Sequence, residues 1–193
     1  MNVDSTNRRR GFGWLKTILA WVGGVGLLAC VLLYVQGWVV ARKFDPEAIR
    51  VMERFVGKGL EGGFTAASTI RIPLAEGVTA QDAAHAMGER AAAHGMGAVE
   101  RLTLQEEDSL RLEIIAFLPP DIPPLLLGED WALATHIPYR VVLYWDGVRG
   151  WLAAMDPGLF VHGLRSTDPE LKSRMVLAKD RLLDIMAAGA NGD

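Results

Sequence analysis

The longest apolar run of the chain lies close to its N-terminus. From Thr17 to Ala41 the sequence carries no Asp, Glu, Lys or Arg. A helix of that length, at about 1.5 Å per residue, exceeds the roughly 30 Å hydrocarbon core of a bilayer. Aromatic residues lie toward the ends of the run, where amphipathic rings settle at the level of the lipid headgroups: Trp14, Trp21, Tyr34 and Trp38. The pattern predicts a transmembrane anchor over residues 17–41, with the lipid bilayer as its partner.

The residues within and after this run indicate whether the segment is cleaved or kept. Trp38 is followed by two valines, an alanine, and then Arg42 and Lys43, which is unlike the small-residue cleavage site of a secretory signal peptide. The tetrad Leu27–Cys30 resembles a lipoprotein processing box, which would lipidate Cys30 after cleavage. A lipoprotein continues with a polar tether, however, and here the chain stays apolar. We therefore expect an uncleaved signal anchor.

The residues before the anchor carry a concentrated positive charge, contributed by Arg8, Arg9, Arg10 and Lys16. A short basic tail is difficult to translocate, whereas a long domain crosses largely regardless of its charge. We expect residues 1–16 to form a cytoplasmic tail at the inner membrane and the C-terminal domain to face the periplasm. Glycines at 23, 24 and 26 make a thin face on the anchor that could admit a membrane-protein partner or a second copy.

After the anchor, apolar residues recur with helical spacing. Asp45 and Pro46 provide a cap and a first-turn proline. The apolar face that follows consists of Ile49, Met52, Phe55, Val56 and Leu60. This predicts a juxtamembrane helix over residues 42–62, followed by a soluble domain over residues 63–193.

Alternation with a period of two then indicates strands. Residues 64–72 alternate in polarity, and the runs 99–105 and 110–116 flank a polar turn, which together predict a strand and a hairpin. In the second run we expect Leu110, Leu112, Ile114 and Ala116 to point inward and Arg111 and Glu113 outward. Between these elements, the alanine-rich stretch from Ala80 to His94 follows Thr79 and Asp82, which is typical of a helix start.

The last third of the chain predicts a second hairpin and a final helix. Prolines from Pro119 to Pro138 interrupt regular structure. The strands 139–145 and 148–155 flank the turn dipeptide Asp146-Gly147. Asp168 and Pro169 start a helix that we expect to end before Gly189. The fold class is therefore α+β, with a small antiparallel-rich sheet of about five strands and helices packed on one face.

The passage from Leu112 to Pro157 resembles the domain of unknown function 302 family. The matching features are a strand entering a proline-containing loop at Ile114–Pro119, a covering segment at 125–134, the strand Ile137–Tyr144, and a glycine turn into Trp151. The resemblance implies a small α+β domain of undefined activity that is often found as a dimer. Many members have a cysteine where this chain has Tyr139, so thiol or metal chemistry in those relatives does not carry over.

Composition excludes several functional classes. The formal net charge is -3 and the predicted domain has no basic block, so nucleic acid is not expected as a partner. The single cysteine, Cys30, lies in the apolar run and leaves no disulfide or thiolate cluster within the chain. The serines lack a Gly-x-Ser-x-Gly elbow, and the glycine-rich residues 57–63 follow a helix where a dinucleotide loop would follow a strand. No cofactor is indicated.

Two sets of residues remain as candidate sites. His85 and Glu89 share one side of a predicted helix and His94 lies further along it, so a metal site completed from elsewhere, for example by His136 or His162, is one hypothesis. The pattern also fits, and better, exposed histidines on an alanine-rich helix surface. The other is an apolar ligand or partner surface formed by Leu125, Leu126, Leu127, Trp131, Trp145 and Trp151. The alternative, which the pattern favours, is that these residues complete the core. The sequence favours a membrane-anchored accessory or binding protein, with a membrane-tethered metal-binding protein or enzyme as the alternative.

Overall fold

The computed structural model of the chain describes residues 13–41, 46–107, 110–126, 131–163 and 168–193. The chain forms two compact units, Met1–Phe44 and Asp45–Asp193. In the first unit, helix α1 spans Gly13–Ala41. Its 24 residues Lys16–Val39 are long and apolar enough to cross a membrane, and none of this stretch is buried by protein.

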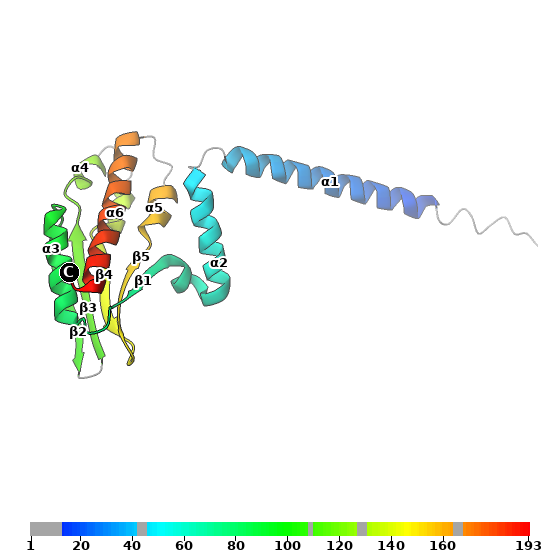
Figure 1. Cartoon of the computed structure of the whole chain (residues 1–193). Helices are drawn as coiled ribbons and strands as arrows, with labels where there is room; N and C mark the ends of the chain where they lie inside the picture. The colour runs from blue at the N-terminus through cyan, green and yellow to red at the C-terminus, as the bar shows by residue number, and fades with distance from the viewer. Residues whose placement is uncertain (1–12, 42–45, 108–109, 127–130, 164–167) are drawn as a thin grey trace, which may run out of the picture. The chain divides into compact units, whose positions relative to one another are not determined.

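The second unit is built on one antiparallel sheet. Its strands are β1 (Thr69–Pro73), β2 (Gly97–Glu107), β3 (Leu110–Leu118), β4 (Tyr139–Trp145) and β5 (Gly150–Met155). They lie in the order β1-β5-β4-β3-β2, so the two hairpins are neighbours and β1 pairs with the outer edge of the second (Figure 1). The predicted five-stranded α+β sheet is thereby confirmed.

The helices described in the second unit are α2 (Pro46–Ser68), α3 (Ala80–Ala93), the short α4 (Pro123–Leu126), the 3-10 helix η1 (Trp131–His136), α5 (Pro157–Gly163) and α6 (Pro169–Asn191). Of these, α3 and α6 cover one face of the sheet. Helices α3 and α6 lie side by side across the sheet (Figure 1). Between these helices and the sheet lies one hydrophobic core, whose largest fully buried side chains include Phe117, Met87, Leu143, Leu152, Leu171, Leu182 and Ile185.

The helix starts follow the predicted capping chemistry. The Thr79 hydroxyl accepts a hydrogen bond from the Asp82 backbone at 3.1 Å, and the Asp82 carboxylate accepts one from the Thr79 backbone at 3.0 Å. This reciprocal pair satisfies backbone donors that the first turn of α3 leaves free. At the start of α6, the Asp168 carboxylate accepts a hydrogen bond from the Glu170 backbone at 2.8 Å, so Asp168 is the N-cap of that helix.

The predicted end of α6 was wrong. The helix continues through Gly189 to Asn191, and Gly192 adopts the left-handed conformation that ends it. Gly189 lies against α3, and a Cβ at this position would collide with the side chain of Met87 and crowd the Ala83 carbonyl. The glycine is therefore needed for close packing between the two helices.

The predicted facing of β3 was also wrong. Glu113 is fully buried on the same side as Ile115 and Phe117, whereas Leu112 and Ile114 are only half-buried on the other side. Arg101 on β2, which is paired with Ile115 and is half-exposed, reaches diagonally to form an ion pair with the Glu113 carboxylate. This pair compensates the charge of a carboxylate that would otherwise be costly to bury.

Residues 64–68, predicted as the start of a strand, are helical. A kink at Gly63, whose φ is 73°, separates this last turn from the rest of α2. The hydroxyls of Ser68 and Thr69 donate to the carbonyls of Phe64 and Thr65, at 2.9 and 2.6 Å, and hold the turn closed. The strand itself covers only Thr69–Pro73.

Strand β2 forms one edge of the sheet and is irregular. Its register against β3 shifts between Ala98 and Glu100 and again between Thr103 and Gln105. The edge carries large exposed apolar side chains at Val99, Leu102 and Leu104. These two shifts interrupt what would otherwise be a long regular strand with free backbone groups.

Candidate functional site

A cavity of about 310 Å³ lies where η1 leads into β4 and β5 leads into α5. The walls are mainly apolar, because β4 and β5 contribute aliphatic side chains and α5 contributes an aromatic ring. The lining residues that carry the argument are Thr69, His136, Tyr139, Arg140, Val142, Ala153, Met155 and Phe160. A space of this size fits a small organic molecule.

One wall of the cavity is a stacked pair of rings. The His136 ring lies against the Phe160 ring, with centroids 3.6 Å apart and planes inclined by 34°. Burial lowers the pKa of His136 below its usual value. The imidazole is therefore neutral at pH 7 and has one nitrogen available as a donor and one as an acceptor.

Tyr139 lies at the base of the cavity, with its ring in the core. Its hydroxyl is buried and is the one buried side-chain polar atom in the described ranges without a hydrogen-bond partner. Burial raises the pKa of Tyr139 to about 12. An unpartnered buried hydroxyl costs on the order of 1–3 kcal/mol, so this group is a local weakness in the core.

Arg140 supplies the positive charge at the cavity. It follows Tyr139 on β4, so its side chain leaves the opposite face of the strand and is exposed. Among the residues that the structure describes, no acidic group forms an ion pair with it. The cavity therefore combines apolar walls, a neutral imidazole and a cation, which suits binding of a small apolar molecule that carries an acidic or hydrogen-bond-accepting group.

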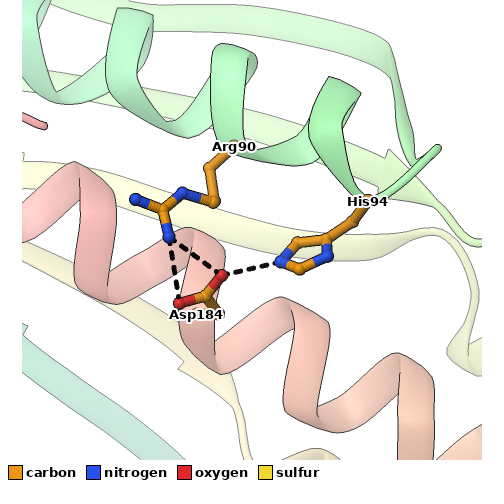
Figure 2. A network of polar contacts seen from close by, with 3 residues as sticks. All are labelled: Arg90, His94 and Asp184. Atoms are coloured by element: carbon orange, nitrogen blue, oxygen red, sulfur yellow. Dashed lines mark hydrogen bonds and ion pairs between the residues drawn. The ribbon is translucent and has the colours of Figure 1, made fainter.

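A second cluster of polar groups joins α3 to α6. Figure 2 shows Arg90 and His94 pointing at Asp184, whose carboxylate lies 2.7 Å from His94 Nε2 and 3.3 Å from Arg90 Nη1. The hydrogen bond with His94, together with the positive charge of Arg90, lowers the pKa of Asp184. All three side chains are between 30% and 43% exposed. This arrangement ties the two helices together at their solvent side.

The four predicted metal ligands lie in three different places. His85 and Glu89 face each other on α3 at 3.4 Å, with side chains 74% and 70% exposed. His94 contacts Asp184, and His136 lines the cavity. Within the described parts of the chain, no group of three or more His, Cys, Asp and Glu side chains is arranged to hold a metal ion.

The predicted apolar surface divides into two parts. Trp145 is the last residue of β4 and Trp151 the second residue of β5, so both lie at the turn end of the hairpin, opposite the end where η1 enters. Trp151 donates to Asp146 at 2.7 Å, and Arg149 lies over its ring at 5.6 Å. The predicted Asp146-Gly147 turn is confirmed, with Gly147 at φ 90°.

The remainder of that surface is only partly described. Leu125 and Leu126 belong to α4 and Trp131 begins η1, but the structure describes only their backbone. Leu127 lies outside the described residues. Sequence reasoning missed Arg140, Phe160 and Asp184, because each gains its role from a residue distant in the chain. Phe160 is carried by α5, which begins at Pro157.

Comparison with known proteins identifies the fold. A crystal structure of an uncharacterized conserved protein DUF302 from Bacillus stearothermophilus aligns with a TM-score of 0.51 and 16% sequence identity. The alignment covers 62% of this chain and 96% of that protein. This chain has that fold. The sequence resemblance to the domain of unknown function 302 family is therefore supported at the level of the fold.

Comparisons of sequence add nothing to this result. No family model matches the chain, and no curated protein matches it. Nearly all of the Bacillus stearothermophilus protein has a counterpart here, while more than a third of this chain lies outside the alignment. That protein is itself uncharacterized, so the likeness supplies an architecture and leaves the chemistry to the residues of this chain.

Proposed function

We propose that this chain is a single-pass membrane-anchored binding protein, an accessory protein whose α+β domain holds a small ligand. The observation that carries the proposal is helix α1, whose 24 residues Lys16–Val39 are apolar and unburied. At about 1.5 Å per residue this stretch measures roughly 36 Å, enough for the hydrocarbon core of a bilayer. So large an exposed apolar surface is soluble only when lipid or protein covers it.

The proposed orientation has the N-terminus in the cytoplasm and the domain outside the inner membrane, in the periplasm. Arg8, Arg9 and Arg10 support it, since a short basic tail is retained on the cytoplasmic side. In this orientation the domain, which has the domain of unknown function 302 fold, is held by the anchor at the outer face of the membrane.

The proposed ligand site is the cavity beside His136 and Phe160. Its apolar walls favour an apolar body, and Arg140 at its margin favours an acidic or acceptor group on the ligand. A binding role fits this site better than a metal-dependent reaction, since of the predicted ligands only His136 lines the cavity and the exposed pair His85–Glu89 lies on α3.

Cell fractionation and intact-mass measurement test the anchor. A secretory signal sequence near the N-terminus has similar length and composition, so the two alternatives differ in whether α1 survives. We expect the protein in the membrane fraction at its full 21.0 kDa, with the domain digested by protease added to spheroplasts. Recovery of a soluble fragment that begins after residue 41 would contradict the anchor, and protection of the domain in spheroplasts would reverse the orientation.

Native mass spectrometry of the detergent-purified protein tests the ligand site. We expect a co-purified small molecule whose occupancy falls at least about tenfold in Ala153→Trp, which fills the cavity, and falls less in Arg140→Gln. Arg149→Gln is the matched control, because Arg149 is an exposed arginine at the other end of the hairpin. A ligand retained by Ala153→Trp would exclude this cavity, and a stoichiometric metal in place of an organic molecule would favour the histidine hypothesis.

A further inference from the structure

Helix α2 carries an apolar stripe that the domain does not cover. Ile49, Met52, Val56 and Leu60 are 54%, 59%, 52% and 85% exposed. At 100° per residue these four side chains fall within about 60° of Ile49 around the helix. Phe64, in the turn after the kink, adds a further apolar side chain that is 74% exposed.

The stripe is separate from the side of α2 that packs on the domain. Val51 is 7% exposed, and Phe55 is half-buried. Counted along the chain at 100° per residue, Val51 lies about 200° and Phe55 about 240° around the helix from Ile49. Helix α2 packs against α5 and β1. The helix therefore has one apolar side occupied by its own domain and another left uncovered.

A third side of α2 is polar. Arg54 and Lys58 are exposed and lie about 140° and about 180° around the helix from Ile49. Arg50 extends this side and forms an exposed ion pair with Glu47 at 2.8 Å. An amphipathic helix with an exposed apolar stripe and a charged side suits the boundary between water and lipid.

The covalent chain brings this stripe close to the membrane. Only four residues, Arg42, Lys43, Phe44 and Asp45, separate the last residue of α1 from the first residue of α2. Even fully extended, the chain from Ala41 to Pro46 spans at most about 18 Å. If α1 crosses the bilayer, as the proposed function states, α2 begins within that distance of the bilayer surface.

We propose that α2 lies along the bilayer interface, with its Ile49–Leu60 stripe inserted among the lipids and its Arg54–Lys58 side in water. The inference rests on the proposed anchor and adds a second membrane contact, which fixes the domain against the surface. The basic residues Arg42, Lys43, Arg50, Arg54 and Lys58 nearly balance the acidic residues Asp45, Glu47, Glu53 and Glu61 in this region. Burial of the apolar stripe therefore drives the contact, and anionic lipid adds little.

Single-cysteine labelling of the full-length protein tests the proposal. Cys30 is the single cysteine of the chain and lies within α1, so in the wild type a fluorophore there reports on the anchor. In a Cys30→Ala background, Val56→Cys and Leu60→Cys place the fluorophore on the stripe. Arg54→Cys and Lys58→Cys place it on the polar side of the same helix and serve as matched controls.

The labelled proteins are placed in phosphatidylcholine nanodiscs, and quenching is compared between brominated lipid and aqueous iodide. We expect bromolipid to quench the stripe positions at least about threefold more than the polar positions, and iodide to show the reverse order. Replacing a third of the lipid by phosphatidylglycerol should change these ratios less than about twofold.

Two outcomes would overturn the proposal. Equal bromolipid quenching on both sides of α2 would show that the stripe does not enter lipid. Protection of the stripe from both quenchers would show that a second copy or another protein covers it. If bromolipid does not quench the label at Cys30, the proposed transmembrane anchor is wrong. Failure of the proposed function is therefore measured at Cys30, and failure of this inference is measured at the α2 positions.

Discussion

Helices α2 and α6 both have 23 residues and both repeat apolar side chains with helical spacing, but they use those side chains differently. In α6 the apolar positions Leu171, Leu182 and Ile185 are at most 1% exposed. In α2 the apolar stripe Ile49–Leu60 is not covered by the domain, and Leu60 is 85% exposed. Amphipathic spacing thus predicts a helix and an apolar side, but it does not identify what covers that side.

The largest expected contrast comes from shortening one leucine on each helix. Leu182→Ala removes a side chain from the packed core and should lower the free energy of unfolding by about 3 kcal/mol. Leu60→Ala should change it by less than about 0.5 kcal/mol, because the side chain makes few contacts within the domain. Urea denaturation in non-ionic detergent, followed by circular dichroism, measures both. Similar losses for the two variants would mean that the domain covers the α2 stripe.

Replacing one glycine by alanine on each helix should give effects of opposite sign. Gly189→Ala places a Cβ against Met87 and Ala83 and should destabilise the domain by about 1–2 kcal/mol. Gly57→Ala meets no atom within 4 Å and should stabilise α2 by about 0.5–1 kcal/mol, since alanine has the higher helix propensity. The same denaturation experiment applies. Stabilisation by Gly189→Ala would refute the close contact of α3 with α6.

A buried polar group on the covered side gives a third, smaller test. Tyr139→Phe removes the unpartnered hydroxyl and should leave stability unchanged or raise it by about 1 kcal/mol at pH 7. Because burial raises the pKa of Tyr139 from 10.0 to about 12, the folded state holds its proton longer than the unfolded state. Wild-type stability should therefore fall as the pH rises from about 10 to about 12.

The Tyr139→Phe variant should lose less of its free energy of unfolding than the wild type when the pH is raised from 9 to 11. Urea denaturation curves at these two pH values measure the difference. A marked loss of stability at pH 7 would instead indicate that the hydroxyl has a partner in the folded protein. A loss of the co-purified ligand with unchanged stability would indicate that the hydroxyl serves the cavity.

The smallest effects are expected for the exposed ionic contacts of the two helices. Asp184→Asn breaks the contact from α6 to α3, whereas Glu47→Gln breaks one within a single turn of α2. The hydrogen bond with His94 and the charge of Arg90 lower the pKa of Asp184. The Asp184 carboxylate therefore stabilises the folded state above about pH 4, and this stabilisation is lost as the pH falls through the lowered pKa. At pH 7 the urea concentration at the midpoint of unfolding should be slightly lower for Asp184→Asn than for Glu47→Gln. At acidic pH the two midpoints should be equal. A difference that persists in acid would contradict the ionic origin.

Local chemistry made much of the fold predictable. The Thr79 and Asp82 capping pair, the Asp146-Gly147 turn and the Asp168 cap each depend on residues a few positions apart, and each forms as expected. The errors occurred where a distant partner decides the outcome. Glu113 was assigned to the outer side because it is charged, but Arg101 on the neighbouring strand compensates its burial.

The candidate site was less predictable for the same reason. His136 was identified as a candidate from its residue type. Its contact with Phe160 depends on α5, a helix that no periodic pattern in the sequence predicted. Asp184 is an ordinary acidic residue of α6 until the packing of α3 brings His94 to within 2.7 Å. Side chains that act through such contacts have no signature in a single sequence.

The irregular edge of the sheet has a consequence if, as the proposed function states, the protein is confined to a membrane surface. Anchoring to a bilayer restricts molecules to two dimensions, and their encounters become more frequent than in free solution. A regular edge strand bearing Val99, Leu102 and Leu104 would invite the strands of neighbouring molecules to pair with it. The two register shifts in β2 interrupt the backbone pattern that such pairing requires, and we expect them to disfavour edge-to-edge pairing between neighbouring copies. The irregularity thus lies in β2, one of the two edge strands of the sheet, where it would act against aggregation.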